Sequence, residues 1–380
     1  MRLLTYLRGI KKAFSQYQPS IKISISSKRL LENLHEYQRH YPSLAFAPVL
    51  KSNAYGHGLI LIAKVLAKEK VPFFVVDSLF EAQAMRQENI KNKILIVGYT
   101  NIQNINHIHL PNVSFTITSL EQLQTITTSI TQPTIFHLKI DTGMHRQGLL
   151  LNQLDEAIKI IKNNSLIKLE GVCSHLADAD NPDKNFSDLQ INNWNQAVQK
   201  IKTVLPQVKF FHLSATAGIY FNKKIQANVV RLGIGLYGIN LSPSASLNLQ
   251  PVLQMESIVS SIKTIGPNEA VGYNLTFKTN QETKIATIPV GYFEGADRRL
   301  SNCGMVKIQN YFCPIRGRVS MNIISVDVTA VPHLQLEDPV TIISNNPTDQ
   351  NSVMNIAKII NTTPHEIFVH LPPHLRRVIQ

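Results

Sequence analysis

Lys51 is the residue whose type and position most directly indicate chemistry. The apolar stretch Phe46–Leu50 has the length of a strand and ends at this lysine, and Leu59–Leu66 has the pattern of a helix. Lys51 is therefore expected at the carboxyl end of a strand, the edge at which parallel α/β proteins bind ligands. A lysine amine there can form a Schiff base with a carbonyl cofactor. The alternative is a surface lysine that simply ends a strand.

Polar motifs also follow four later strand-like stretches. Arg146 presents a planar fork suited to a carboxylate, and Thr216 lies in a turn whose hydroxyl and N–H groups could bind an anion. Arg231 is followed by Gly233, where backbone N–H groups could approach a phosphate. His175 is the fourth candidate, although a lone histidine is more often structural. Asp178 and Asp180 suggest no third ligand, so no metal site is predicted.

The elements that must position these residues alternate between strands and helices. Eight strand-like stretches are expected at Phe46–Leu50, Phe73–Asp77, Ile94–Tyr99, Ser114–Ile117, Thr134–Ile140, Lys168–Cys173, Val208–Leu213 and Val229–Ile234. Helical patterns lie between them, for example at Leu150–Ile161 and Leu189–Val204. This alternation predicts an α/β fold, a (β/α)8 TIM-type barrel, with a doubly wound sheet as the alternative.

The pattern changes after residue 248. Short strands with turn residues between them predict a mainly antiparallel β domain, and the last forty residues return to helix at Met354–Ile360 and Pro364–Leu371. The expected strands are Ile258–Ile265, Ala270–Phe277, Lys284–Tyr292, Met305–Ile308, Ser320–Val328 and Val340–Ile343. The predicted organisation is an N-terminal extension at 1–21, the barrel at 22–247, a linker at Ser242–Ser246 and the β domain at 248–380. Within the extension, Leu3, Leu7, Ile10 and Phe14 fall at helical spacing and predict a short amphipathic helix.

Composition excludes several classes of protein. The 380 residues carry a net charge of +13, but their lysines and arginines are spread along the chain. No basic block typical of a nucleic-acid arm is present, so no nucleic-acid partner is expected. No stretch reaches the ~20 apolar residues of a membrane span, so no membrane association is expected. Three widely spaced cysteines give no disulfide framework, which favours a reducing, cytoplasmic location.

The segment Lys51–Gly58 resembles the pyridoxal phosphate (PLP) signature of bacterial alanine racemases, the fold-type III PLP enzymes. The resemblance extends over residues 22 to 378, with the major motifs in order. It implies that Lys51 carries PLP and that Tyr55 contacts its phosphate. It also implies that Thr216, Gly233 and Ile234 contact the phosphate.

Further roles follow from the same resemblance. His175 would lie beneath the PLP ring, in a hydrogen-bond chain to an arginine. Arg231 would face the pyridine nitrogen and keep its own proton, which favours racemisation over transamination. Arg146 would bind the substrate carboxylate and the cofactor hydroxyl, and Lys139 matches a lysine that is often carbamylated to orient that arginine. Two departures lie in these motifs. His145 replaces a frequent glycine, and Ala215 replaces a usual asparagine.

Three residues of the β domain also match family positions, and two depart from them. Tyr273 resembles the second catalytic base, whereas packing is the alternative role for a strand tyrosine. Tyr292 matches a tyrosine at the substrate entrance, and Met321 matches a methionine whose backbone N–H binds the substrate carboxylate. His365 stands where a phosphate-contacting tyrosine is usual, and Asn322 replaces a usual aspartate.

The resemblance predicts an isomerase that interconverts L-alanine and D-alanine and so supplies D-alanine for the peptidoglycan of the cell wall. Lys51 would take the α-proton of the D enantiomer and Tyr273 that of the L enantiomer. Tyr273 and Met321 would come from a second subunit, which predicts a homodimer. The alternatives are a racemase of serine, lysine or several amino acids, and a PLP-binding protein without racemase activity.

Overall fold

The computed structural model describes residues 18–107, 110–241 and 247–380, which form two compact units. One unit is Ser26–Val252, and the other contains Leu253–Gln380 together with the strand at Lys22–Ile25. The predicted amphipathic helix at Leu3–Phe14 and the predicted linker at Ser242–Ser246 lie outside the described residues.

The first unit is the predicted parallel barrel, and this fold class is confirmed. Its strands are β2 (Ala45–Pro48), β3 (Phe74–Val76), β4 (Ile94–Ile96), β5 (Val113–Ile117), β6 (Thr134–Lys139), β7 (Ile167–Cys173), β8 (Phe210–His212) and β9 (Val229–Leu232). β3 to β8 pair in sequence order as one six-stranded parallel sheet, and β2 pairs with β9. The parallel bridge between Val49 and Val75 joins β2 to β3, and Asn228 N–H donates to Phe211 C=O between β9 and β8. The ring of eight strands therefore closes.

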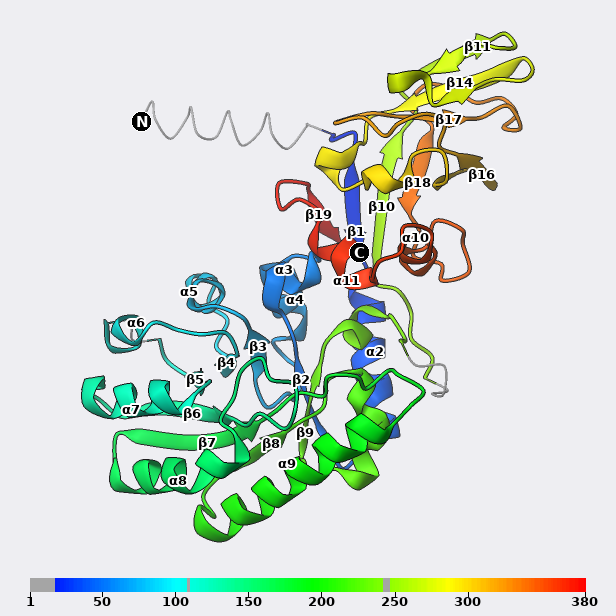
Figure 1. Cartoon of the computed structure of the whole chain (residues 1–380). Helices are drawn as coiled ribbons and strands as arrows, with labels where there is room; N and C mark the ends of the chain where they lie inside the picture. Colours follow the sequence, from blue (N-terminus) through cyan, green and yellow to red (C-terminus); the bar gives the residue numbers. More distant parts are fainter. Residues whose placement is uncertain (1–17, 108–109, 242–246) are drawn as a thin grey trace, which may run out of the picture. The chain divides into compact units, whose positions relative to one another are not determined.

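Helices connect the strands in the alternating order that the sequence predicts (Figure 1). They are α2 (Ser27–His40), the short α3 (Lys51–Tyr55), α4 (Leu59–Leu66), α5 (Leu79–Gln87), α6 (Ile102–His107), α7 (Leu120–Ser129), α8 (Leu154–Asn163) and α9 (Asn185–Val204). Serine side chains cap three of them, because Ser26, Ser78 and Ser119 each accept a hydrogen bond from an N–H in the first turn. Ser78 and Glu81 together form a capping box at the start of α5.

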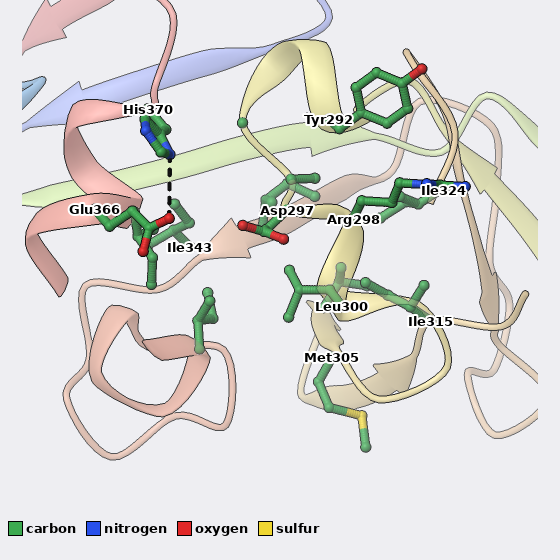
Figure 2. A pocket seen from close by; sticks show the side chains of 16 residues that line it. Tyr292, Asp297, Arg298, Leu300, Met305, Ile315, Ile324, Ile343, Glu366 and His370 are labelled. Atoms are coloured by element: carbon green, nitrogen blue, oxygen red, sulfur yellow. Dashed lines mark ion pairs between the residues drawn. The ribbon is translucent and has the colours of Figure 1, made fainter. Parts of the chain in front are cut away.

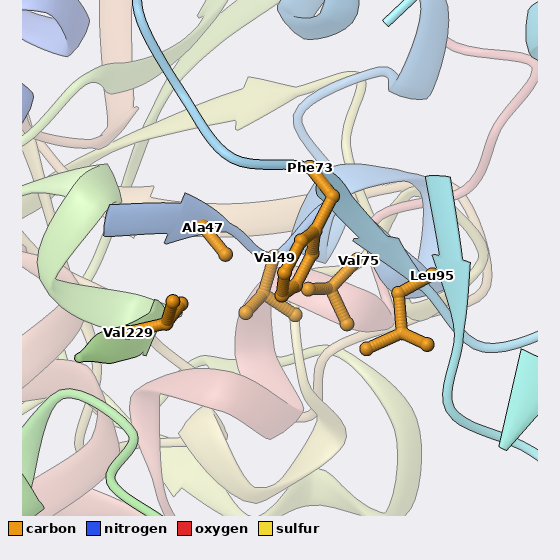
Figure 3. Packing of buried hydrophobic residues seen from close by; sticks show 6 residues of the cluster. All are labelled: Ala47, Val49, Phe73, Val75, Leu95 and Val229. Atoms are coloured by element: carbon orange, nitrogen blue, oxygen red, sulfur yellow. The ribbon is translucent and has the colours of Figure 1, made fainter. Parts of the chain in front are cut away.

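Apolar and aromatic side chains fill the barrel. Figure 3 shows Phe73 beside Val49 and Val75, in a buried cluster that also contains Ala47, Leu95 and Val229. The Phe73 ring lies 5.4 Å from the His137 ring, 5.2 Å from Phe210 and 5.6 Å from His212, measured between centroids. The interior is therefore a packed core with two histidines in it, and not an open channel.

The second unit is built mainly of antiparallel strands. One six-stranded sheet has the order β16 (Tyr311–Pro314), β15 (Met305–Ile308), β18 (Pro339–Ile343), β10 (Leu253–Ile258), β1 (Lys22–Ile25) and β19 (Arg377–Ile379). A three-stranded sheet contains β11 (Ser261–Ile265), β14 (Thr283–Ile288) and β17 (Ile324–Asp327). The predicted helices near the end of the chain are α10 (Val353–Ile359) and α11 (Pro364–Val369).

Two details of this unit differ from the sequence prediction. The barrel was predicted from residue 22, but β1 pairs with β10 and β19 and so belongs to the sheet of the second unit. The single strand predicted at Ala270–Phe277 is wrong. It is a hairpin of β12 (Ala270–Val271) and β13 (Phe277–Lys278), whose tip is a 3-10 turn at Tyr273–Leu275. Positive φ angles of 75° at Gly272 and 59° at Asn274 interrupt the strand there.

Candidate active site

Lys51 begins a left-handed turn at the carboxyl end of β2. Ser52, Asn53, Ala54 and Tyr55 have φ angles of 55°, 56°, 53° and 52°, a conformation that costs roughly 1–2 kcal/mol per residue for L-amino acids. The Lys51 side chain is 40% exposed, and its Nζ lies 3.9 Å from the Asp77 carboxylate. Such strain is found where the surrounding structure holds a functional segment in one conformation.

Polar contacts stabilise this turn. Asn53 Oδ1 accepts a hydrogen bond of 2.8 Å from Leu59 N–H, and Glu81 Oε1 accepts one of 3.3 Å from Asn53 N–H. The His57 ring stacks on Tyr237 with centroids 4.3 Å apart. The asparagine and histidine of the segment after Lys51 therefore support the backbone that presents Lys51 and Tyr55.

Arg231 is almost fully buried at the end of β9 and is held by backbone carbonyls. Its Nη2 group donates to Ser174 C=O at 2.7 Å and to Leu213 C=O at 2.9 Å, and Nη1 donates to His212 C=O at 2.5 Å. Nη1 also lies 2.8 Å from His212 Nδ1, and Nη2 lies 3.0 Å from His175 Nδ1. The Nε–H group has no acceptor among the described residues, so this donor is left for a ligand.

The histidines around Arg231 are neutral, and the direction of each hydrogen bond between them can be assigned. Burial, reinforced by the charge of Arg231, lowers the pKa of His175 to about 3 and that of His212 well below its ordinary value. A guanidinium can only donate, so Nδ1 of each ring must accept and Nε2 must carry the proton. We therefore assign His212 Nε2–H as the donor to His137 Nδ1, 2.8 Å away. His137 is itself buried, and burial followed by Lys93 and Arg231 lowers its pKa to about 3.

Thr216 and Gly233 form a cradle beside Tyr55. Thr216 Oγ1 accepts hydrogen bonds of 3.2 Å from Gly233 N–H and 3.2 Å from Gly235 N–H, so its own O–H remains as a donor. A Cβ at Gly233 would lie 2.9 Å from Tyr55 Oη and 3.8 Å from Thr216 Oγ1, so only glycine leaves this space open. Burial raises the pKa of Tyr55 to about 12, which keeps its hydroxyl protonated.

Arg146 lies in the loop after β6 and is exposed. Asp141 Oδ1 holds this loop by accepting from Gly143 N–H at 2.9 Å and from His145 N–H at 3.1 Å. His145 has a φ of 52°, which explains physically why glycine would fit this position well. Lys139 Nζ donates to Gln147 Oε1 at 3.1 Å, and burial, with the charges of Arg231, Arg146 and Lys51, lowers its pKa.

These barrel residues surround one cavity of about 520 Å3, which lies within the ~300–1,000 Å3 typical of small-molecule sites. Its lining includes Lys51, Tyr55, Lys139, Arg146, His175, Arg231 and Gly233. The residues fit PLP, because the cavity offers an amine, the unsatisfied Nε–H donor of Arg231 and the glycine cradle with its hydroxyl donors. The described residues contain no cluster of three or more His, Cys, Asp or Glu side chains that could hold a metal ion.

The remaining predicted site residues belong to the second unit. Tyr273 and Tyr292 lie in 3-10 turns and are 70% and 45% exposed, and Met321 lies in a loop and is 55% exposed. Phe293 N–H donates to Met321 C=O at 2.9 Å, so the segments that carry Tyr292 and Met321 are neighbours. His365 is in α11.

Sequence reasoning missed several residues of the site. Asp77 follows β3 and lies 3.9 Å from Lys51 Nζ, and the available signal was a charged residue at the carboxyl end of the predicted strand Phe73–Asp77. His137 and His212 continue the hydrogen-bond network of Arg231 into the barrel. Both lie within strands, and the sequence around a strand histidine does not indicate which residues it contacts.

We expect Arg231→Lys to destabilise the barrel strongly. A lysine keeps the charge but cannot satisfy three carbonyls and two histidine nitrogens, and a buried unsatisfied acceptor costs about 1–3 kcal/mol. The thermal midpoint should therefore fall by roughly 6 °C or more, given about 2–4 °C per kcal/mol for a domain of this size. Arg146→Lys is the control: this exposed arginine in the same cavity should change the midpoint by under ~2 °C. An unchanged midpoint in Arg231→Lys would contradict the assigned network.

Comparison with known families places both units in one group of proteins. Residues 25–241 match the family described as alanine racemase, N-terminal domain, and residues 252–379 match alanine racemase, C-terminal domain. An alanine racemase of Lactobacillus acidophilus is 34% identical over 373 residues, which cover 94% of this chain and 96% of that protein. An alanine racemase of Methanococcus maripaludis is 30% identical over 362 residues, covering 93% of this chain and 97% of that one.

Solved structures give the same result. The alanine racemase of Clostridium difficile has a TM-score of 0.88 with this chain at 28% identity, covering 96% of this chain and 97% of that one. The alanine racemase of Bacillus anthracis with bound L-Ala-P has a TM-score of 0.87 at 26% identity and covers 96% of each chain.

Proposed function

This chain belongs to the alanine racemase family and is an amino-acid racemase, and we propose that its barrel holds PLP and that alanine is its substrate. The observation that supports this most is the cavity in which Lys51, the Arg231 Nε–H and the Thr216–Gly233 cradle meet. PLP, when bound, supplies an electron sink that makes the α-proton of an attached amino acid acidic.

The residues of the barrel hold and orient this cofactor. Lys51 would anchor it, and the Tyr55 hydroxyl, the Thr216 hydroxyl and the Ile234 N–H would donate to its phosphate, while Gly233 leaves the space that the phosphate needs. Arg231 would donate its Nε–H to the nitrogen of the cofactor ring and keep its own proton, which favours return of a proton to the α-carbon. His175 would help to hold the ring, and its Nε2–H points away from Arg231.

Residues of the second unit complete the site. Tyr273 and Lys51 are the two bases, with Tyr273 removing the α-proton of L-alanine and Lys51 that of D-alanine, each from its own face. Arg146 and the Met321 N–H bind the substrate carboxylate, and Tyr292 lines the entrance. His365 contributes an imidazole to the phosphate.

We also propose that the active enzyme is a homodimer with sites shared between subunits. Three segments of the second unit together expose six of its large apolar side chains, as expected of a surface that is covered by another protein. They are Tyr273, Leu275, Tyr292, Phe293, Met321 and Ile323. A cytoplasmic role in supplying D-alanine for the cell wall is consistent with three free cysteines. Among the described residues, no helix combines the length and the apolar character needed to cross a bilayer.

Exchange of the α-proton in D2O tests this function. The protein reconstituted with PLP should incorporate deuterium into both L-alanine and D-alanine and should convert each into the other. Serine and lysine in the same panel should react at least ~10-fold more slowly, because one methyl side chain fills a small site best. If serine or lysine exchanged its α-proton faster than alanine, that amino acid would be the substrate. Absence of any exchange would indicate a PLP-binding protein without racemase activity.

A further inference from the structure

Two segments of the second unit are joined backbone to backbone around Tyr292 and Met321. Tyr292 N–H donates to Ser320 C=O at 3.0 Å, and Phe293 N–H donates to Met321 C=O at 2.9 Å. A Cβ at Gly291 would lie 2.3 Å from Ser320 C=O oxygen, so only glycine allows this approach. The position of the Met321 segment therefore depends on the position of the Tyr292 segment.

These hydrogen bonds also fix the direction of the Met321 N–H. This N–H and the Ser320 C=O belong to one peptide unit, which is trans, so the two groups point in opposite directions. Since the carbonyl accepts from Tyr292 N–H, the Met321 N–H points away from the Tyr292 segment. It has no acceptor among the described residues, which is what a donor for a substrate carboxylate requires.

Glu294 and Asn322 form a side-chain link between the same two segments. The Glu294 side chain is buried, with 8% of the residue exposed, and Oε2 accepts a hydrogen bond of 2.8 Å from Gly291 N–H. Oε1 accepts one of 2.6 Å from Asn322 Nδ2. Both carboxylate oxygens are therefore used, one within the Tyr292 segment and one across to the residue after Met321. We call this pair the carboxylate–amide clamp.

A cavity borders the Tyr292 segment on another side. Tyr292, Gly295, Ala296 and Asp297 line a cavity of about 320 Å3, whose opposite walls are mainly apolar (Figure 2). Figure 2 shows Tyr292, Asp297 and Leu300 among the side chains that line this cavity. The clamp and the backbone hydrogen bonds therefore act together with the stacking of Phe293 on His374, whose ring centroids lie 5.0 Å apart, to position the segment.

The charge of Glu294 makes an amide the suitable group at position 322. An aspartate here would place two carboxylates within hydrogen-bonding distance of each other. Like charges at this separation repel, and neither oxygen could donate. With Glu294 opposite, this chain needs an amide donor at position 322.

We propose that Glu294 and Asn322 are positioning residues that aim the Met321 N–H at the substrate carboxylate. This proposal rests on the proposed function and adds to it the pair that sets the carboxylate subsite. Neither side chain needs to touch the substrate. The substrate carboxylate is present before and during the reaction, so a misdirected Met321 N–H should raise KM and leave kcat nearly unchanged.

A reciprocal exchange of the two groups tests the clamp. Asn322→Asp in the PLP-loaded enzyme should raise KM for alanine roughly tenfold, which lies within the range of coupling between contacting residues. The double variant Glu294→Gln with Asn322→Asp should restore KM to within about twofold. The amide oxygen of the introduced glutamine can accept from Gly291 N–H while its NH2 group donates to the introduced carboxylate. Glu294→Gln alone should change KM only slightly. The Asn322 amide can rotate so that its oxygen accepts a hydrogen bond from the NH2 group of the introduced glutamine.

Asn310→Asp is the matched control, because it adds the same charge to the same unit and Asn310 is an exposed residue outside the clamp. Its KM should change by less than about twofold. A loss of kcat without a change in KM in Asn322→Asp would indicate a general loss of folded enzyme and would overturn the positioning role. A double variant as impaired as Asn322→Asp would also overturn it.

Thermal unfolding separates this proposal from the proposed function. The midpoint should fall by about 2–4 °C in Asn322→Asp and recover in the double variant, whether or not the enzyme racemises alanine. If the enzyme with the natural sequence shows no α-proton exchange, the proposed function is wrong. The recovery of the thermal midpoint in the double variant then still decides whether the clamp exists.

Discussion

Lys51→Ala is expected to abolish racemisation, with α-proton exchange at least ~10⁴-fold slower in both enantiomers, because in the proposed function this one residue supplies both the covalent anchor and one of the two bases. The strained turn from Ser52 to Tyr55 exists to present this amine, and alanine leaves the turn without a reactive group. Exchange in D2O measures the loss, and borohydride reduction followed by peptide mapping measures the attachment. In the natural sequence, the peptide that contains Lys51 should carry the added mass.

Lys64→Ala is the matched control for this loss. Lys64 lies on α4, the helix that follows the turn, and its exposed ammonium pairs with Glu88 at 2.6 Å. Removing such a surface pair costs about 1 kcal/mol or less, so exchange should remain within about twofold of the natural sequence. Reduction that labels Lys139 in place of Lys51 would show that the anchor has been assigned to the wrong lysine.

The barrel could be predicted from the sequence because its strands and helices follow local patterns. Apolar stretches of strand length alternate with helical periodicity, and polar motifs after the strands mark the ligand-binding edge. The pairing of β1 with β10 and β19 could not be predicted in this way. Its partners lie more than two hundred residues away, and a strand of four residues carries no signal for its neighbours.

The site, like the fold, has features that local sequence patterns predict and features that depend on tertiary contacts. The positions of Lys51 and Thr216 after their strands, and of Arg231 near the end of β9, were sufficient to bring them together in one unit. The left-handed turn after Lys51 was not predictable, because of its four residues only asparagine is enriched at positive φ, and four such residues in a row are rare. Tertiary contacts from Glu81 and Tyr237 hold the turn, and single-residue preferences contain nothing about such contacts.

Loss of the Tyr273 hydroxyl is expected to affect the two enantiomers unequally. Tyr273→Phe removes only the phenolic oxygen, so the base for one face is lost while the shape of the turn at Tyr273–Leu275 is kept. In single-turnover exchange, loss of the α-proton from L-alanine should slow by about 10²–10⁴-fold, and loss from D-alanine should slow far less, because Lys51 acts on that face. Equal losses for both enantiomers would reject the assignment of faces.

Tyr311→Phe is the control for Tyr273→Phe, because Tyr311 is a 39% exposed tyrosine of β16 in the same unit and has no assigned role. Its exchange rates should stay within about twofold for both enantiomers. A comparable loss in this variant would mean that removal of any exposed phenol from the unit impairs the enzyme.

Mixing the two impaired variants tests whether Tyr273 and Lys51 come from different subunits. If they do, a mixed dimer of Lys51→Ala and Tyr273→Phe chains has one site with both natural residues and one site with neither. Equal amounts that exchange subunits freely give half mixed dimers, so about a quarter of the natural activity should return. If both residues of a site come from one chain, every site in the mixture lacks one base and no activity returns. Since each variant alone is expected to be nearly inactive in converting L-alanine, recovery on mixing can come only from a site that two chains build together.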